Sequence, residues 1–207
     1  MPFELSLKEG AFLVKLARNS IEQFLKTGEK LPTPKNTPSK LMEKCGVFVT
    51  LNRMEGGTKE LRGCIGYPEP TLPLVEATID SAVNAAVNDP RFSPVRLDEL
   101  NQILIEVSVL TPPKLIEAKD PKDYPHKIKI GRDGLIVERD WHKGLLLPQV
   151  PVEWHWDKLE FLGSCCMKAG ISPDSWLLEG TKIYSFQAIV FEEECPNGKI
   201  KRVKLGE

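Results

Sequence analysis

An arginine and a cysteine stand two residues apart in Leu61-Arg-Gly-Cys-Ile-Gly66, a predicted strand in which two glycines bracket the cysteine. Alternate side chains of a strand share a face, so Arg62, Cys64 and Gly66 are expected to point the same way. A nearby cation favours the thiolate, the reactive form of cysteine. Glycine inside a strand is typical of places where a ligand or another backbone comes close. These residues predict a site with Cys64 as candidate nucleophile or redox group, lined by Arg62, Gly63 and Gly66.

Cys64 also has a simpler interpretation, because free cysteine is among the most buried residue types. A catalytic cysteine needs a base, usually a histidine, within hydrogen-bond reach. The sequence has three histidines, and all of them lie in its second half: His126, His142 and His155. Whether the chain is an enzyme is therefore left open.

Two further polar residues belong to the predicted site. Glu106 lies on a neighbouring predicted strand, so Arg62 is expected either to form a salt bridge with it or to bind an anionic ligand. Gln149 follows a leucine run at a turn of the chain. Its amide is a candidate for contacting a substrate group, or for satisfying nearby backbone.

The composition limits the classes of function. The chain has 207 residues, 41% of them hydrophobic, which suits one moderate domain or two small lobes. Its 28 basic and 29 acidic residues leave a net charge of -1, so the basic stripe of a nucleic-acid binder is not expected. No apolar run reaches membrane-spanning length, and the first residues do not resemble a signal peptide. Five cysteines without CxxC spacing favour a cytoplasmic chain with free thiols.

Neither a cofactor nor a metal site is expected. P-loop, GxGxxG, HExxH and GxSxG motifs are missing from the sequence. Cys165 and Cys166 are adjacent on a predicted helix and would not converge on one ion, so core packing is favoured. Trp154 and Trp156 precede that helix and are interpreted as a hydrophobic staple and inter-lobe packing, with a partner-binding aromatic patch as the alternative.

Periodicity and capping signals predict the elements that must position these residues. Helices are expected after Ser6 up to Gly28, from about Thr71 to Val87, and from Asp157 to Gly170. A hairpin is expected to join Val47–Leu51 to the glycine–cysteine strand through Glu55-Gly-Gly-Thr58. Further strands are expected at 103–110, 145–147 and 183–191. A second hairpin is expected to join Lys127–Ile130 to Leu135–Val137 through Gly131–Gly134. Parallel βαβ alternation is missing, which indicates an α+β chain with antiparallel sheets.

Six segments in order resemble the AMMECR domain family, and the resemblance covers nearly the whole chain. Its signature is Leu61–Gly66, and it is accompanied by Asn88–Phe92, Val107–Pro112, Gly131–Leu135, Gly144–Val150 and Lys168–Gly170. The resemblance is to an archaeal-type, single-domain member. It implies two α+β subdomains, each with an antiparallel sheet, around a cleft that the signature faces. The expected division is 1–112 plus 181–207 for the larger subdomain and 113–180 for the smaller, inserted one.

The resemblance implies no particular reaction. It implies a protein or other sizeable substrate in the cleft, with Memo-like or radical-SAM proteins as pathway partners, an association through gene neighbourhood rather than chemistry. Two classes of function remain. An enzyme would use Cys64 chemically, whereas a non-catalytic binding module or scaffold would use the same groove for a peptide or protein segment.

Overall fold

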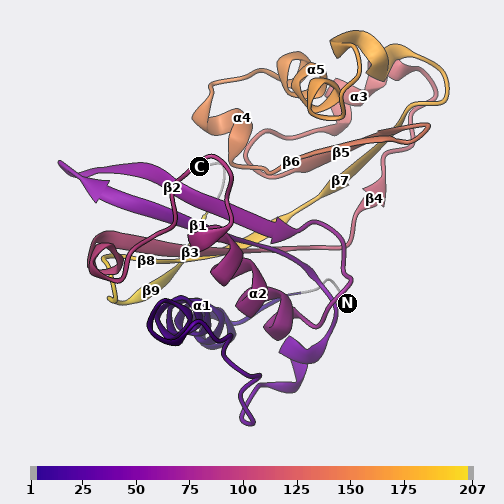
Figure 1. Cartoon of the computed structure of the whole chain (residues 1–207). Coiled ribbons are helices and arrows are strands. Elements are labelled where there is room, and N and C mark those ends of the chain that lie inside the picture. The colour runs from indigo at the N-terminus through magenta and orange to yellow at the C-terminus, as the bar shows by residue number, and fades with distance from the viewer. Residues whose placement is uncertain (1–3, 205–207) are drawn as a thin grey trace. The chain divides into compact units, whose positions relative to one another are not determined.

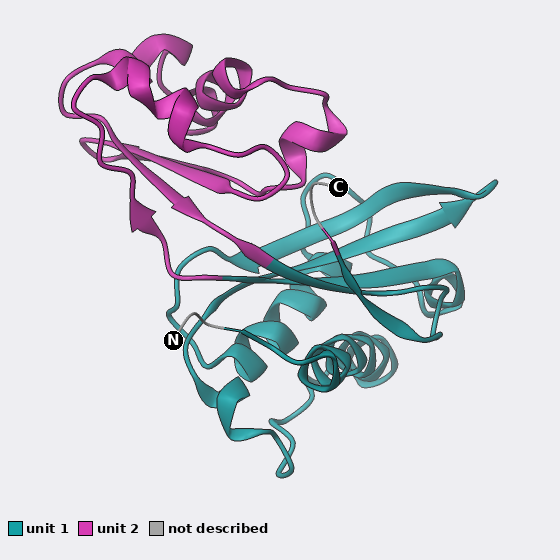
Figure 2. Cartoon of the chain, turned by 180° about the vertical axis from the view of Figure 1, so that it is seen from behind, with its two compact units in different colours: residues 1–110, 189–203 teal, residues 111–188, 204–207 magenta. Residues whose placement is uncertain are grey.

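The computed structural model describes residues 4–204, which form two compact units (Figure 2). Of the described residues, unit 1 comprises 4–110 and 189–203, and unit 2 comprises 111–188 and Lys204. Each unit has its own antiparallel sheet and its own buried apolar cluster. The chain is therefore α+β, as predicted from the sequence.

The sheet of unit 1 has five strands in the order β2-β1-β3-β8-β9. Their bounds are Gly46–Glu55 (β1), Thr58–Tyr67 (β2), Ile103–Leu110 (β3), Ala188–Glu193 (β8) and Ile200–Val203 (β9). Glycines at positive φ form the β1–β2 turn, at 58° for Gly56 and 88° for Gly57, as the two-residue glycine turn predicts.

Two long helices of unit 1, α1 (Leu7–Thr27) and α2 (Leu74–Val87), lie on one face of this sheet (Figure 1). The predicted capping box opens α1, because Ser6 Oγ accepts from the backbone N–H of Glu9 and the Glu9 carboxylate accepts from that of Ser6. Gly28 ends the helix in the left-handed conformation. Short 3₁₀ helices, η1 (Ser39–Met42) and η2 (Leu97–Gln102), connect these elements.

The core of unit 1 lies between the sheet and the helices. Val47, Val49 and Leu51 alternate along β1 with side chains on the opposite face, and all three are fully buried with the apolar side of α1. Burying such a side chain stabilises the fold by about 1.5–3 kcal/mol. The opposite face of the sheet, which carries Thr50 and Cys64, is the one available for a site.

One buried ion pair joins the two ends of the sequence. The Arg18 guanidinium donates to both carboxylate oxygens of Glu193, at 2.6 and 2.5 Å, and both side chains are buried. Arg18 also donates to the carbonyls of Leu100 and Ile103, and Glu193 accepts from the backbone N–H of Ile105. These bonds attach α1 to β3 and β8.

Unit 2 has a four-stranded sheet in the order β4-β7-β5-β6. The strands are Lys114–Leu115 (β4), Gly134–Arg139 (β5), His142–Leu146 (β6) and Lys182–Phe186 (β7). Its helical elements are η3 (Pro121–Asp123), α3 (Tyr124–Lys127), α4 (Val150–Glu153), α5 (Lys158–Lys168) and η4 (Pro173–Leu177). The predicted capping box of Asp157 and Glu160 begins α5.

Two predictions about strands are wrong. The second hairpin pairs β5 with β6 through Asp140 and Trp141, and not Lys127–Ile130 with β5, because Lys127 is the last residue of α3. Gly131 and Asp140 both take a positive φ, of 77° and 54°. The Asp133 carboxylate binds the backbone N–H of Lys129 instead, so that Gly131–Gly134 forms a local turn. The single strand expected at 183–191 is two strands, β7 and β8, in different sheets.

The chain passes between the units at residues 110/111 and 188/189. The second passage lies after β7 and not at the expected 180/181, because β7 pairs with β4 and β5 of unit 2. Thr111 and Gln187 are bonded to each other beside these passages. The Thr111 N–H donates to the Gln187 carbonyl, and the Gln187 N–H donates to Thr111 Oγ1, each at 2.8 Å.

Candidate functional site

Cys64 lies in a row of polar side chains that crosses three strands of unit 1. Thr50 on β1 is paired with Cys64 on β2 and with Glu106 on β3. The Cys64 N–H and carbonyl bond away from β1, so Cys64 and Thr50 form a non-hydrogen-bonded pair, the kind with the closer side chains. Thr50 Oγ1 accordingly donates to Cys64 Sγ at 3.3 Å. The row is half-buried and faces away from α1 and α2.

The thiol of Cys64 is held in its neutral form. Burial raises its pKa, and the Glu106 and Asp89 carboxylates act in the same direction. The hydrogen bond from Thr50 and the charge of Arg91 oppose this shift without reversing it. The expected lowering of the pKa by Arg62 is therefore wrong, because Arg62 is not among the groups that determine the thiol's pKa.

The outer edge of β2 is closed by the segment that follows α2. The Cys64 N–H donates to Asp89 Oδ2 at 2.8 Å, and Arg91 Nη2 donates to the Cys64 carbonyl at 3.4 Å. Edge strands leave backbone groups unpaired, and covering them prevents pairing with other chains. Asp89 and Arg91 thus take the place of a neighbouring strand at Cys64.

Asp89 is the centre of this contact. Its side chain is 2% exposed and accepts from the Arg91 backbone N–H, Nε and Nη2 as well as from Cys64. The hydrogen bond from the Arg91 guanidinium is the main cause that lowers the pKa of Asp89, to about 2, although burial opposes it. Arg91 in turn lies 5.3 Å from the ring centroid of Phe92.

Arg62 is displaced from its expected position by a β-bulge. Leu51 is paired with Gly63 and Asn52 with Leu61, which leaves Arg62 as the extra residue of β2. Its Nε and Nη2 donate to Glu99 at 3.2 and 3.0 Å. The ion pair expected with Glu106 is therefore replaced by one with Glu99.

The carbonyls of Ser93 and Pro94 accept from the same guanidinium, at 2.8 and 3.4 Å. Only 12% of the Arg62 side chain is exposed. These contacts give Arg62 a positioning role, in which it attaches the bulge of β2 to the segment after α2.

Both glycines of the signature allow close approach of backbone. A Cβ on Gly63 would lie 2.1 Å from the carbonyl oxygen of Ala85, so this glycine lets α2 lie against β2. A Cβ on Gly66 would lie 2.2 Å from the carbonyl oxygen of Val47 and 2.6 Å from the ring of Phe48. The sequence predicted close approach at both glycines, and the approaching atoms come from the protein itself.

Gln149 belongs to unit 2 and begins α4. Its carbonyl accepts from the backbone N–H groups of Val152 and Glu153, at 3.1 and 3.0 Å. Glu106 belongs to the row around Cys64, where Ser108 Oγ donates to its carboxylate at 3.3 Å. Of the predicted site residues, Cys64 and Glu106 thus lie on one face with Gly66, whereas Gln149 belongs to the other unit.

The remaining cysteines do not assemble a metal site. Cys165 and Cys166 are fully buried in the core of unit 2, as the helical spacing predicted, and Cys45 is buried in unit 1. Within residues 4–204, no three His, Cys, Asp or Glu side chains are grouped so that they could hold a metal ion.

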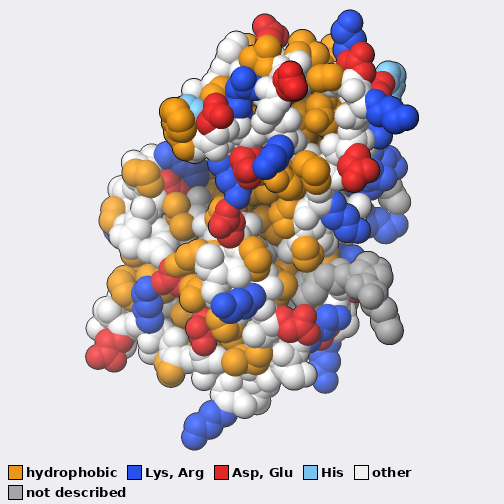
Figure 3. Space-filling view, turned by 90° about the vertical axis from the view of Figure 1, so that its right-hand side faces the viewer, with side chains coloured by type: hydrophobic (Ala, Val, Ile, Leu, Met, Phe, Trp, Pro, Cys, Tyr) orange, Lys and Arg blue, Asp and Glu red, His pale blue; other side chains and the backbone are white. Residues whose placement is uncertain are grey.

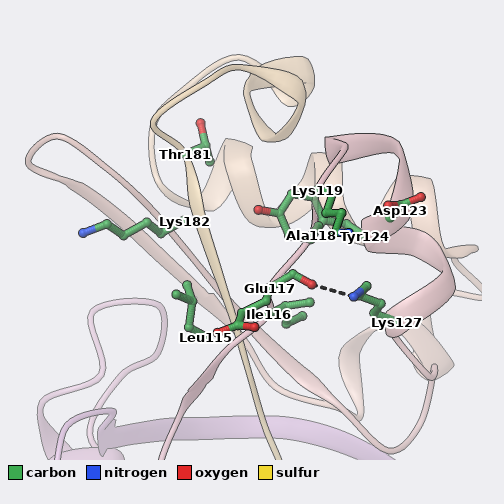
Figure 4. Close-up of a pocket in the computed structure, with 10 residues that line it drawn as sticks. All are labelled: Leu115, Ile116, Glu117, Ala118, Lys119, Asp123, Tyr124, Lys127, Thr181 and Lys182. Atoms are coloured by element: carbon green, nitrogen blue, oxygen red, sulfur yellow. Dashed lines mark hydrogen bonds between the residues drawn. The ribbon is translucent and has the colours of Figure 1, made fainter.

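Unit 2 also carries a surface pocket of about 540 Å³, shown in Figure 4. Leu115–Lys119 and α3 form much of its wall, and Thr181 and Lys182 close another side. Lys127 Nζ donates to the Glu117 carbonyl at 2.6 Å. Lysines and carboxylates are mixed around this pocket, which the sequence did not predict.

Charges of both signs are interspersed on the molecular face seen in Figure 3, with apolar side chains between them. Among the helices of the described residues, none combines the length and the apolar character needed to cross a membrane.

Comparison with known proteins identifies the family and the relatives of this chain. The family model described as AMMECR1 matches residues 14–191. The chain belongs to the AMMECR1 family. The matched region includes Thr50, Cys64 and Glu106 and the segment after α2 that closes the edge of β2.

Archaeal members of the AMMECR1 family are similar over almost their full length. Protein PH0010 of Pyrococcus horikoshii is 58% identical over 206 residues, which cover 99% of this chain and 100% of that protein. Protein MJ0810 of Methanocaldococcus jannaschii is 53% identical over 201 residues, covering 97% of this chain and 98% of that protein.

A crystal structure titled as that of the uncharacterized protein PH0010 superposes with a TM-score of 0.92 at 58% identity. The match covers 98% of this chain and 100% of the other.

Sequence reasoning missed three residues that hold Cys64. Asp89 and Arg91 were not among the predicted site residues, although their segment, Asn88–Phe92, is one of the family motifs. Two motifs that are separated in a sequence and shared by a family are candidates for mutual contact. Thr50 could be found only with the register of the β1–β2 hairpin, which the bulge at Arg62 alters.

Proposed function

We propose that this AMMECR1-family chain is a binding module, and that the sheet face around Cys64 is the surface that receives a segment of a partner protein. The observation that carries the proposal is the state of Cys64. Its thiol is half-buried, accepts a hydrogen bond from Thr50 and has a raised pKa. A neutral thiol is a weak nucleophile but a suitable contact surface for a partner.

Hydrogen bonds and close packing hold the backbone around Cys64 in place. Asp89 and Arg91 hold both backbone polar groups of Cys64, and Gly63 fits against α2. A backbone segment fixed in this way loses little conformational freedom on binding, which favours affinity.

A second candidate function is cysteine-based catalysis. Thr50 Oγ1 donates to Cys64 Sγ, and such a donor would stabilise a thiolate once the proton had left. The two functions differ in what Cys64 must do. Binding requires only that this position stay small enough to leave the sheet face open, whereas catalysis requires the sulfur atom of Cys64.

Alkylation kinetics separate these functions. In a Cys195→Ser background, which removes the exposed competing thiol, iodoacetamide should modify Cys64 more slowly than it modifies glutathione at pH 7. The rate should rise only as the pH approaches and passes the ordinary cysteine value. Modification at pH 7 faster than that of glutathione would contradict the binding module and favour catalysis.

Binding can be measured with a purified Memo-like protein as the probe, by isothermal titration calorimetry. Cys64→Ala should retain affinity and Cys64→Trp should abolish it, because the larger side chain blocks the face. Lys8→Trp is the matched control, since Lys8 is exposed on α1 beyond the opposite face. Loss of affinity in all three variants, or in none, would contradict this face as the binding surface.

A further inference from the structure

A groove of about 440 Å³ lies along α5 and η4, entirely within unit 2. Trp156, Leu159 and Met167 line it from the α5 side, and Trp176 lines it from η4. Leu159 and Met167 are eight residues apart on one helix, which corresponds to roughly 12 Å along its axis. The groove is therefore long enough for two turns of a second helix.

Two of the apolar side chains that line this groove are unusually exposed, whereas Trp176 is only 8% exposed. Leu159 is 54% exposed and Met167 58%, and both belong to a helix whose other side is buried in the core. Trp154 is 66% exposed and stacks on Trp156 with the ring centroids 6.2 Å apart. Contiguous exposed apolar surface marks interaction sites, and tryptophan is enriched among residues that dominate binding energy.

The charges at the groove have one sign. Glu160 and Asp174 are the ionisable residues in its lining, which includes neither lysine nor arginine. Glu160 Oε2 accepts from the Asp157 backbone N–H within the capping box, and Asp174 is exposed at the rim. A partner that covers the apolar side chains of the groove would bind more tightly if it placed lysine or arginine at this rim. An anionic lipid surface would be repelled by the two carboxylates.

We propose that this groove binds an amphipathic helix of a partner protein, with large apolar side chains on one face and lysine or arginine at the border of that face. Apolar anchors in a groove with complementary border charges are the ordinary mode of helix-in-groove recognition. Methionine adapts its shape to different apolar partners and suits such a surface. This site is independent of the function proposed for the Cys64 face, because all its residues belong to unit 2.

The test uses the full chain and a fluorescein-labelled, 14-residue peptide of leucine and lysine with helical amphipathic periodicity. Fluorescence anisotropy should show saturable binding below 1 mM. Leu159→Ser with Met167→Ser should weaken the affinity about tenfold, as truncation of anchor residues does. Asp174→Lys should weaken it through charge. Leu7→Ser is the matched control, since Leu7 is 52% exposed on α1 of unit 1, and it should bind like the parent.

Three comparisons complete the test. A scrambled leucine–lysine peptide should bind about tenfold more weakly or worse, as should a leucine–glutamate peptide of the original periodicity. Phosphatidylglycerol vesicles should not retain the protein. Equal binding of the scrambled peptide, no effect of the groove variants, no saturation below 1 mM, or vesicle binding that depends on Leu159 and Met167 would each overturn the proposal.

Discussion

The backbone N–H of Cys64 donates to the carboxylate of Asp89 at 2.8 Å, and this bond joins two sequence motifs that lie 25 residues apart. Asp89 is almost completely buried and holds Arg91 with the same carboxylate. The geometry of the candidate site therefore depends on a residue that does not itself point into it.

Asp89→Asn should lower the free energy of unfolding by about 2–3 kcal/mol at pH 7. The variant keeps the size of the side chain but removes the charge from hydrogen bonds that are stronger for being charged. Urea denaturation measures the change. Asp98→Asn is the control, because Asp98 forms an exposed pair with Arg96 and its loss should leave the unfolding free energy almost unchanged. Equal losses in the two variants would contradict a special role of Asp89.

The stabilisation by Asp89 should also disappear in acid. Its pKa in the folded protein is lowered to about 2, whereas aspartate in an unfolded chain titrates near 3.9. The unfolded chain therefore binds the proton more readily, so the stabilisation is complete above about pH 4 and is lost as the pH falls towards 2.

The difference in unfolding free energy between the parent and Asp89→Asn isolates this effect. Other carboxylates with lowered pKa values, such as Glu9 and Asp80, are common to both proteins. The difference should shrink as the pH falls from 4 to 2. A difference that stays constant over this range would mean that the Asp89 charge is not the cause.

Gly63→Ala and Gly66→Ala should each destabilise the fold by about 1–3 kcal/mol or more, because the new Cβ would overlap backbone atoms that cannot move aside. Cys64→Ala should cost less than either glycine substitution, since it removes one atom from a half-buried position. Thermal melts compare the three variants.

Gly163→Ala in α5 is a matched control for the glycine substitutions. Its Cβ would lie 3.4 Å from Pro173, close to an ordinary contact, and alanine favours a helix. An equal loss of stability in Gly163→Ala and Gly63→Ala would show that the close approach of α2 to Gly63 does not cause the destabilisation.

Arg18→Met should destabilise the protein by about 3–5 kcal/mol, because it leaves the buried Glu193 carboxylate without its cation. Combining it with Glu193→Leu should recover part of the loss, since both charges are then absent. A double-mutant cycle measured by urea denaturation gives the coupling. Additive losses in the double variant would show that the two side chains do not stabilise each other.

Local signals predicted the long helices well. Ser6 with Glu9 and Asp157 with Glu160 begin α1 and α5 as expected, because capping depends on residues three positions apart. Strand pairing was predicted less well. Gly131–Gly134 has the composition of a hairpin turn and Gly131 takes a positive φ, yet the hairpin forms at Asp140 and Trp141, since tertiary packing selects between competing turns.

The surroundings of Cys64 could be predicted only in part. A two-residue turn pairs Glu55 with Thr58, and continuing that register would place Thr50 opposite Gly63. The bulge at Arg62 moves the register by one residue, so Thr50 lies opposite Cys64 instead. The contacts of Asp89 with Cys64 and of Arg62 with Glu99 join distant parts of the chain, and no local pattern reports them.

The buried pair of Arg18 and Glu193 has a consequence for synthesis on the ribosome. All of residues 111–188, which build unit 2, must be translated before Glu193 exists. At typical translation rates, those nearly 80 residues take roughly 4–16 s. During that time α1 has no carboxylate for Arg18, and β3 has no β8 beside it. The nascent chain can complete its second unit before its first, so the early half is the part expected to need a chaperone.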